Sequence, residues 1–167
     1  MEKTNITSNP LFVLYEPVLR PLGLAIVEIR QNDRGKSIEL EVAITRLGGD
    51  ATSKDCDAAY HAIYPIAMGE AGPLRDVFLT VETPGMLRAI KDVHEFELFT
   101  GRSVKVYDST RAAWIIGRIA GFDGEKLSLE QVQEGPGKET LEHLELDIAQ
   151  IQKAKLEYLE EDWKDGR

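Results

Sequence analysis

The stretch VETPGMLRAIKDVHEFELFTG, residues 81–101, marks the point where one sequence pattern ends and another begins. Before it, apolar residues recur at both helical and strand spacing, whereas after it they recur only at the two-residue spacing of short strands. Pro84 fixes its own φ angle and Gly85 permits a positive one, which predicts a turn. Arg88 and Lys91 add two positive charges beside that turn. The stretch is therefore predicted to form a rigid, basic joint between two small domains and to act as a binding surface.

The chain as a whole is acidic, with a net charge of −9 over 167 residues. Hydrophobic residues make up 43% of it, which is enough for one medium core or two small ones. A general nucleic-acid binder has a basic domain, so the overall charge argues against that class. The window from Arg75 to Arg118 nevertheless holds slightly more basic than acidic residues, which leaves room for a local basic patch.

The cysteine content and the hydropathy pattern indicate the compartment. The single cysteine, Cys56, cannot form an internal disulfide, which is typical of a reducing environment. No run approaches the roughly 18 apolar residues that a membrane span requires, and the opening MEKTNITSNP has no apolar signal core. We therefore expect a cytoplasmic protein that does not contact membranes.

Residues 1–99 are predicted to form a two-layer α/β domain with the order helix, strand, strand, helix, strand, helix. Pro17 is expected to bend the first helix, and Pro65 to end or kink the second. The predicted elements are a helix from Asn9, strands at residues 24–30 and 37–46, a helix capped by Thr52 and Asp55, a strand at 77–81 and a helix at 92–99.

Residues 100–157 are predicted to form a second, all-β domain. Five short strands in so few residues are typical of a small SH3-like or OB-like barrel, because closure removes exposed sheet edges. The strands are predicted at residues 103–107, 112–122, 126–132, 140–146 and 151–156, with a turn at Gly135-Pro136-Gly137. Residues 158–167 form an acidic tail. The fold class is therefore α+β: an α/β domain followed by an SH3-like barrel.

The sequence gives little support for an enzyme. His61, His94 and His143 are far apart, and one cysteine cannot supply a zinc site of the usual spacing. Cys56 lies on the apolar face of its helix, where an inert thiol is expected. A hydrolase would need a cluster of acid, base and nucleophile that the spacing does not show. We expect no catalysis, no metal and no cofactor.

Two groups of residues could form a binding surface. The joint offers the Thr83 hydroxyl and two cations, which could contact phosphate or an acidic protein. Equally, Arg88 could pair internally with Glu82 or Asp92, and spacing alone leaves both interpretations open. In the second group, Tyr107 and Trp114 could stack on bases, although packing in the core or at an edge is favoured for sparse aromatic residues in a small barrel.

A further set of residues carries a family resemblance over residues 11–156. They are Glu16-Pro17-Val18-Leu19, Gly23, Val27-Glu28, Asp55-Cys56, Pro84-Gly85 with Arg88, Phe96, Phe99, Gly101, Val104-Lys105-Val106, Gly117-Arg118-Ile119 and Gly121-Phe122-Asp123-Gly124. With the order of elements, they resemble the bacterial ribosome maturation factor P family, the small assembly factors of the small ribosomal subunit. The chain departs from the family's joint, where Thr83 stands for serine, Leu87 for aspartate and Ala89 for proline.

The resemblance implies a non-catalytic, monomeric factor that binds the immature small ribosomal subunit and leaves the mature particle. Its expected partner is a basic small-subunit ribosomal protein of the decoding region, with the joint docking against that protein or nearby rRNA. An acidic surface suits a basic client and limits indiscriminate RNA binding. The alternative is an autonomous single-stranded RNA-binding barrel that uses Tyr107 and Trp114. The residues expected to bind the ribosomal subunit or its partner protein are Thr83, Pro84, Gly85, Arg88, Lys91, Arg102 and Lys105.

Overall fold

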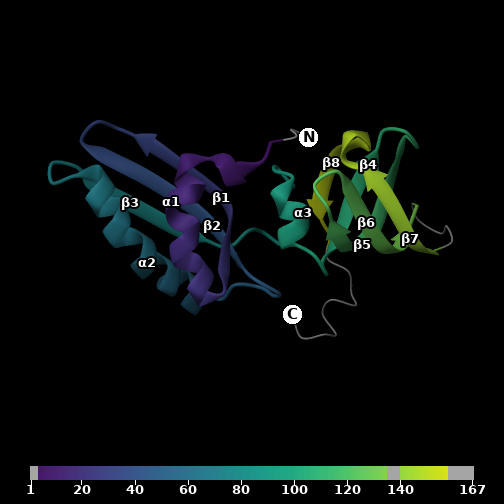
Figure 1. The fold of residues 1–167 in the computed structure, drawn as a ribbon, viewed down its shortest axis with the longest axis horizontal. Coiled ribbons are helices and arrows are strands. Elements are labelled where there is room, and N and C mark those ends of the chain that lie inside the picture. The colour runs from purple at the N-terminus through teal and green to yellow at the C-terminus, as the bar shows by residue number, and fades with distance from the viewer. Residues whose placement is uncertain (1–3, 135–139, 158–167) are drawn as a thin grey trace. The chain divides into compact units, whose positions relative to one another are not determined.

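A computed structural model describes residues 4–134 and 140–157 of the chain. Within them the protein has three α-helices and eight strands in two sheets, which confirms the α+β class (Figure 1). The chain divides into two compact units. The first is Ile6–Pro84, and the second comprises the described residues of Met1–Asn5 and Gly85–Arg167. The division therefore lies earlier than the predicted boundary at residue 99, and the short helix expected in the first domain belongs to the second unit.

The first unit packs two helices on one three-stranded sheet (Figure 1). Strands β1 and β2 form an antiparallel hairpin, and β3 runs parallel to β2 after the crossover through α2. Its elements are α1 (Pro10–Leu19), β1 (Leu24–Asp33), β2 (Ser37–Arg46), α2 (Ser53–Ala71) and β3 (Asp76–Glu82), with short 3-10 helices at Ile6–Ser8 and Arg20–Leu22.

The starts of both long helices follow from local chemistry. Asn9 caps α1, since its side-chain oxygen accepts the Leu11 N–H at 2.9 Å, and Pro10 occupies the first helical position. At α2, Thr52 and Asp55 form the predicted capping box, each side chain accepting the other's backbone N–H. Both helix starts could therefore be read from the sequence.

The end of α2 differs from the prediction. Pro65 does not end the helix, which continues to Ala71. A proline inside a helix removes one backbone hydrogen bond, but here Ile63, Ala67 and Ala71 are buried in the core on either side of it. Packing of this face on the sheet outweighs the local penalty, so the helix continues beyond Pro65 to Ala71.

Charged side chains hold the first unit together from within. Glu16, near the end of α1, accepts the Ile26 N–H of β1 at 2.9 Å and pairs with Arg20 at 2.7 Å. The pairing of β1 with β2 shifts register just after Ile26. In the same unit, Arg46 of β2 binds the Asp55 carboxylate at the start of α2. Buried carboxylates need such partners, so these residues fix the helices to the hairpin.

The second unit is built on a five-stranded antiparallel sheet of order β7-β6-β5-β4-β8 (Figure 1). Within the described residues no ladder joins β7 to β8, so the predicted closed barrel is not found. The elements are α3 (His94–Leu98), β4 (Ser103–Asp108), β5 (Ala113–Phe122), β6 (Lys126–Gln133), β7 (Thr140–Asp147), a 3-10 helix at Ile148–Gln150 and β8 (Ile151–Leu156). The predicted turn at residues 135–137 and the acidic tail at 158–167 lie outside the described residues.

One side of this sheet forms the core of the second unit. Helix α3 packs there through Phe96, whose ring centroid lies 5.6 Å from that of Phe122. Gly101 adopts a φ of 92° before β4, a conformation that favours glycine. The buried core residues are Ile90, Phe96, Phe99, Val104, Val106, Ile115, Ile119, Leu127, Leu129, Val132, Leu146, Ile151, Ala154 and Leu156.

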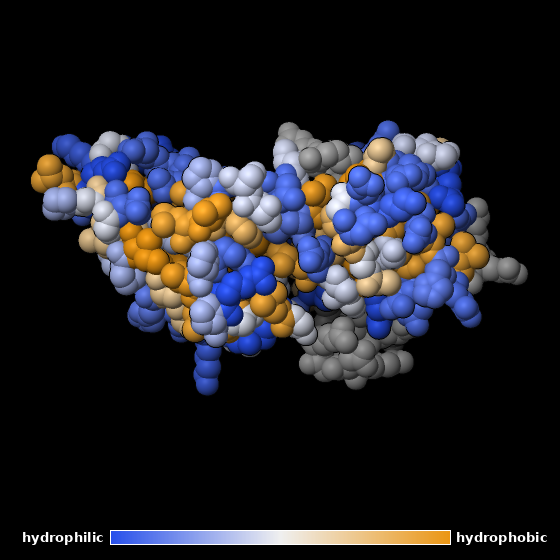
Figure 2. Space-filling model, viewed as in Figure 1, coloured by the Kyte–Doolittle hydropathy of each residue, from blue (hydrophilic) through white to orange (hydrophobic). Residues whose placement is uncertain are grey.

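The described surfaces differ in hydropathy. In Figure 2, hydrophobic residues gather over the region of α1 in the first unit, whereas hydrophilic residues cover much of the visible face of the second. Among the helices of the described residues, none combines the length and apolar content needed to cross a bilayer.

Candidate binding surface

Arg88, the central cation of the predicted joint, is engaged inside the second unit. Its side chain is 9% exposed, and its Nε donates to Glu95 Oε1 at 2.6 Å. Its Nη2 donates to the second oxygen of Glu95 at 3.3 Å. Of the two interpretations left open, the internal pair is the one observed, with Glu95 as the partner in place of Glu82 or Asp92. The expectation of an exposed docking cation at Arg88 is therefore corrected.

Glu95 organises the chain that leads into α3. Its side chain is fully buried, with 0% exposed. Besides Arg88, its Oε2 accepts the backbone N–H of Lys91 at 3.0 Å and that of Asp92 at 2.9 Å. A buried carboxylate is tolerated when it is both paired and hydrogen-bonded, and Glu95 meets both conditions. Arg88 therefore stabilises the fold of the second unit by neutralising this acid.

A second buried acid, Asp92, extends the same cluster. Its Oδ2 accepts the Thr4 hydroxyl at 3.0 Å, and its Oδ1 lies 2.6 Å from His94 Nδ1. Oδ1 also accepts the His94 backbone N–H at 3.0 Å. The Val93 N–H donates to the Thr4 carbonyl at 3.2 Å. These bonds explain why Thr4, which comes before the first unit in the chain, belongs to the second.

The turn of the joint lies slightly later than the sequence predicts. The Arg88 N–H donates to the Gly85 carbonyl at 3.2 Å, so Met86 and Leu87 are its central residues. Gly85 does not use the positive φ angle that glycine permits. Lys91 is exposed. The two cations that the sequence places together thus have different surroundings, one buried and one on the surface.

The other residues expected to bind are spread over both units. Thr83 and Pro84 end the first unit, and Gly85 begins the second. Thr83 and Gly85 are exposed, and Pro84 is half-buried. Arg102 is half-buried in the turn before β4. Lys105, on β4, belongs to a separate group of aromatic and basic residues.

Lys105 has an aromatic partner on the neighbouring strand. Its Nζ lies 5.1 Å from the centroid of the Trp114 ring, within the range of a cation–π contact. Trp114 also meets Tyr107 edge-on, with ring centroids 5.4 Å apart. Trp114 is 37% exposed, so it does not fill the core. The ring therefore packs at the sheet surface, and its exposed part is accessible to a ligand.

The strand register gathers these residues on one face of the sheet. Paired residues of neighbouring strands, and alternate residues along one strand, share a face. Two adjacent rows cross β5, β4 and β8 in this way. The first row consists of Trp114, Tyr107 and Lys153, and the second of Ile116, Lys105 and Lys155. We call the group Trp114, Tyr107, Lys105, Lys153 and Lys155 the basic-aromatic face.

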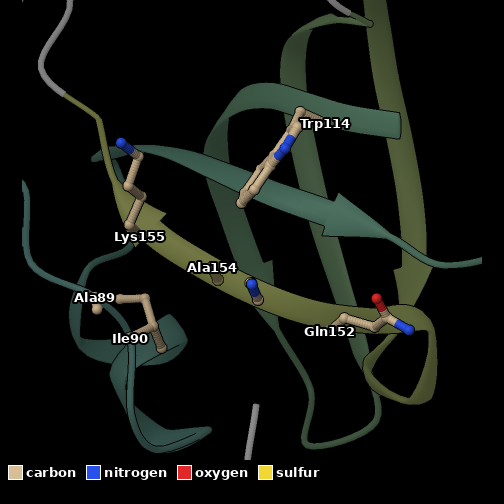
Figure 3. Close-up of a pocket in the computed structure, with 7 residues that line it drawn as sticks. Ala89, Ile90, Trp114, Gln152, Ala154 and Lys155 are labelled. Atoms are coloured by element: carbon tan, nitrogen blue, oxygen red, sulfur yellow. The ribbon is translucent and has the colours of Figure 1, made fainter. Parts of the chain in front are cut away.

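A pocket of about 250 Å³ adjoins the basic-aromatic face. In Figure 3, Trp114 and Lys155 lie on one side of β8, and Ala89 and Ile90 lie on the neighbouring chain segment. That segment runs along β8 because the Ile90 N–H donates to the Ala154 carbonyl at 2.8 Å. The lining residues are Ala89, Ile90, Trp114, Gln152, Lys153, Ala154 and Lys155. The joint thus contributes a wall of this pocket through its apolar residues, not through Arg88.

The turn between β4 and β5, which presents Trp114, is held by a buried acid. Asp108 accepts the Thr110 N–H at 2.9 Å and an Arg111 N–H at 2.7 Å. Burial of Asp108 raises its pKa, but the hydrogen bonds from Arg111 and Thr110 lower it by more, so the pKa lies below its usual value. Arg111 also pairs with Glu134 at 3.2 Å. The start of β5, and with it Trp114, is therefore positioned by a charged network.

The same face of the sheet carries acidic residues at its other edge, on β6 and β7. Glu130 of β6 pairs with His143 of β7, and alternate residues of β7 that face the same way are Glu145 and Asp147. Glu145 and Asp147 are exposed. Along the sheet the surface charge therefore changes sign from β7 to β8.

The residues that sequence reasoning missed are Glu95, Lys153 and Lys155. Glu95 could not be found from its spacing, because its partners come from a loop whose path depends on the folded unit. The sequence does indicate the two lysines. Lys153 and Lys155 alternate with the apolar Ala154 and Leu156 in the last strand, which places both cations on one face.

No protein-family model matches the chain. The family resemblance therefore rests on the residues quoted from the sequence.

Proposed function

We propose that this protein is a non-catalytic ribosome maturation factor of the ribosome maturation factor P type. It binds the immature small ribosomal subunit, together with a basic ribosomal protein of the decoding region, and leaves the mature particle. The proposal includes the finer fold assignment, an SH3-like second unit, and a monomeric, cytoplasmic protein.

The observation that carries the proposal is the role of the charged residues in the resemblance. Glu16, Asp55 and Arg88 each form an internal ion pair or hydrogen bond that fixes a helix or loop of its unit. Such residues are expected in a shared sequence pattern when they are needed for a shared fold. Their positions support the resemblance through structure, independently of any single motif.

The arrangement of the five strands supports the SH3-like assignment. The last strand, β8, pairs with the first, β4, and a 3-10 helix at Ile148–Gln150 precedes it. This strand order is typical of small SH3-like barrels, in which the first strand lies between the last and the second.

The charge distribution supports a basic client. The chain carries a net charge of −9, and Glu130, Glu145 and Asp147 face one side of β6 and β7. Acidic surfaces attract a cationic protein and speed its capture. The role first assigned to Arg88 changes, because this residue stabilises the joint internally. Contact with the basic ribosomal protein is assigned to the acidic surface instead.

Co-sedimentation with purified ribosomal particles tests the proposal. We expect the full chain to sediment with immature small subunits and not with mature ones. Equal binding to both particles, or binding to neither, would contradict the proposed function.

The alternative is an autonomous single-stranded RNA-binding module, which the exposed Trp114 and its neighbouring lysines favour. Such a module would bind free RNA and show no preference for the immature particle. The same sedimentation experiment, with free single-stranded RNA as competitor, separates the two functions.

A further inference from the structure

We propose that the basic-aromatic face binds unpaired nucleotides of single-stranded RNA, with a base stacked on Trp114 and phosphates held by Lys153 and Lys155. The inference rests on the proposed function, because an immature small subunit supplies RNA that is not yet folded. It assigns to β4, β5 and β8 an RNA contact at the opposite edge of the sheet from the acidic residues of β6 and β7.

The stacking platform is the Trp114 indole. Its ring is 37% exposed, and its edge contact with Tyr107 fixes its orientation. Lys105 lies over the ring at 5.1 Å from the centroid. The pocket is lined by Trp114 and not by Lys105, so it meets a part of the indole that this lysine leaves open. A base that enters the pocket can therefore reach the aromatic surface.

The charge of this face complements a phosphate backbone. Lys153 and Lys155 line the pocket, and Lys105 pairs across β4 with Lys155. The two rows that cross β5, β4 and β8 contain three lysines and no acidic residue. In a chain of net charge −9, such a local concentration is unusual. Contact with phosphates would release counterions and make binding depend on salt.

The apolar part of the pocket favours RNA over an acidic peptide as its occupant. Ala89, Ile90 and Ala154 line it beside the indole. A glutamate-rich peptide would use the lysines but leave the aromatic and apolar surfaces without a partner. A nucleotide uses both, since its base stacks on the ring and its phosphate meets a lysine.

The test follows Trp114 directly in the full chain. The chain has two tryptophans, and a Trp163→Phe background leaves Trp114 as the single tryptophan, whose emission is followed by selective excitation of the indole. We titrate it with an oligouridylate of about eight nucleotides, within the site sizes of small single-strand-binding barrels. We expect saturable quenching of Trp114 and an affinity that falls as salt rises. An absence of quenching at low salt would overturn the inference.

Variants separate the stacking and phosphate interactions, with anisotropy of fluorescein-labelled oligouridylate as the readout. Trp114→Leu should weaken binding on the order of tenfold, since it removes one stack, and Trp114→Phe should restore part of the loss. Joint replacement of Lys153→Gln and Lys155→Gln should reduce the slope of log affinity against log salt by about 0.7 for each phosphate that is no longer neutralised. The matched control is Lys126→Gln on β6, which should leave both quantities unchanged.

Two further outcomes decide against the inference. One is an equal loss of affinity in the Lys126→Gln control and in the Lys153→Gln, Lys155→Gln protein. Such a result would show that a surface lysine contributes to RNA affinity regardless of its position. The other is quenching of Trp114 fluorescence by a polyglutamate peptide but not by oligouridylate. Unchanged urea midpoints in all variants ensure that a loss of binding does not reflect unfolding.

Failure of this inference is distinguishable from failure of the proposed function. If the chain sediments with immature subunits but does not bind oligouridylate, the function stands and the RNA site is wrong. If Trp114 binds oligouridylate but the chain does not prefer immature particles, the site stands and the maturation function is wrong.

Discussion

Arg88 shows how a single buried acid decides what a basic residue does. A guanidinium beside a turn could face a partner, but Glu95 takes its Nε at 2.6 Å inside the second unit. The same carboxylate also binds two backbone amides, those of Lys91 and Asp92. The residue therefore shapes the joint and does not offer its charge to a client.

Replacing Arg88 should destabilise the second unit strongly. Arg88→Ala leaves the buried Glu95 carboxylate without its counter-charge, which typically costs about 3–5 kcal/mol. Urea unfolding followed by Trp114 fluorescence in a Trp163→Phe background reports on this unit. Lys91→Ala is the matched control: it removes an exposed cation and should change the free energy of unfolding by less than about 0.5 kcal/mol. Equal effects of the two variants would contradict the assigned role of the pair.

Asp55 should make the stability of the first unit depend on pH in acid. Hydrogen bonds from Arg46, and then from Thr52, lower the pKa of this carboxyl to about 2. Because the folded pKa lies below the unfolded value near 4, the stabilisation is present above about pH 4 and is lost as the pH falls toward 2.

The Asp55→Asn variant isolates this effect. Far-UV circular dichroism follows α1 and α2 during urea unfolding at pH 7 and at pH 3. We expect the wild-type midpoint to fall more between these pH values than the variant midpoint does, so the two proteins become more alike in acid. Equal decreases of the two urea midpoints between pH 7 and pH 3 would show that Asp55 does not contribute to the acid sensitivity.

At the scale of elements, local signals were enough to predict most helices and strands. Asn9 with Pro10, and Thr52 with Asp55, act within one helical turn, so the two helix starts follow from sequence. The continuation of α2 past Pro65 could not be predicted from the sequence, because it depends on the packing of that helix against the sheet.

The candidate site was harder to predict than the fold, because its contacts join distant elements. Lys105 was expected to bind, but its pairing with Trp114 on β5 and Lys155 on β8 depends on strand order. Sequence alone gives the alternation within β8 and does not say which strand lies beside it. The two interpretations of Arg88 could not be separated for the same reason, since Glu95 becomes its partner only in the folded loop.

Two glycines of β5 offer a test of packing within one element. A methyl group at Gly117 would meet Leu129 Cβ at 3.2 Å and Val132 Cγ2 at 3.4 Å, whereas one at Gly121 would meet nothing within 4 Å. Gly117→Ala should therefore destabilise the second unit by about 1–3 kcal/mol through overpacking. Gly121→Ala, the matched control, should be close to neutral. Urea unfolding of both variants decides this, and a larger loss at Gly121 would contradict the packing described for β5 and β6.

At the scale of the whole molecule, different surfaces of the second unit have different proposed partners. The acidic edge of the sheet, with Glu145 and Asp147 of β7, suits a basic ribosomal protein. The basic-aromatic face, with Lys153 and Lys155, suits RNA. A net charge of −9 keeps general affinity for RNA low, so that binding depends on the local lysines.

The most direct test of this account is co-sedimentation of three full-length proteins with purified immature small subunits: the wild type, a Lys153→Gln, Lys155→Gln variant and a Lys91→Gln variant. We expect the wild type and the Lys91→Gln variant to bind equally, because Lys91 lies outside the basic-aromatic face, and we expect the variant lacking both β8 lysines to bind more weakly. Full binding by the latter, together with loss of binding in Lys91→Gln, would contradict the account and return the contact to the joint.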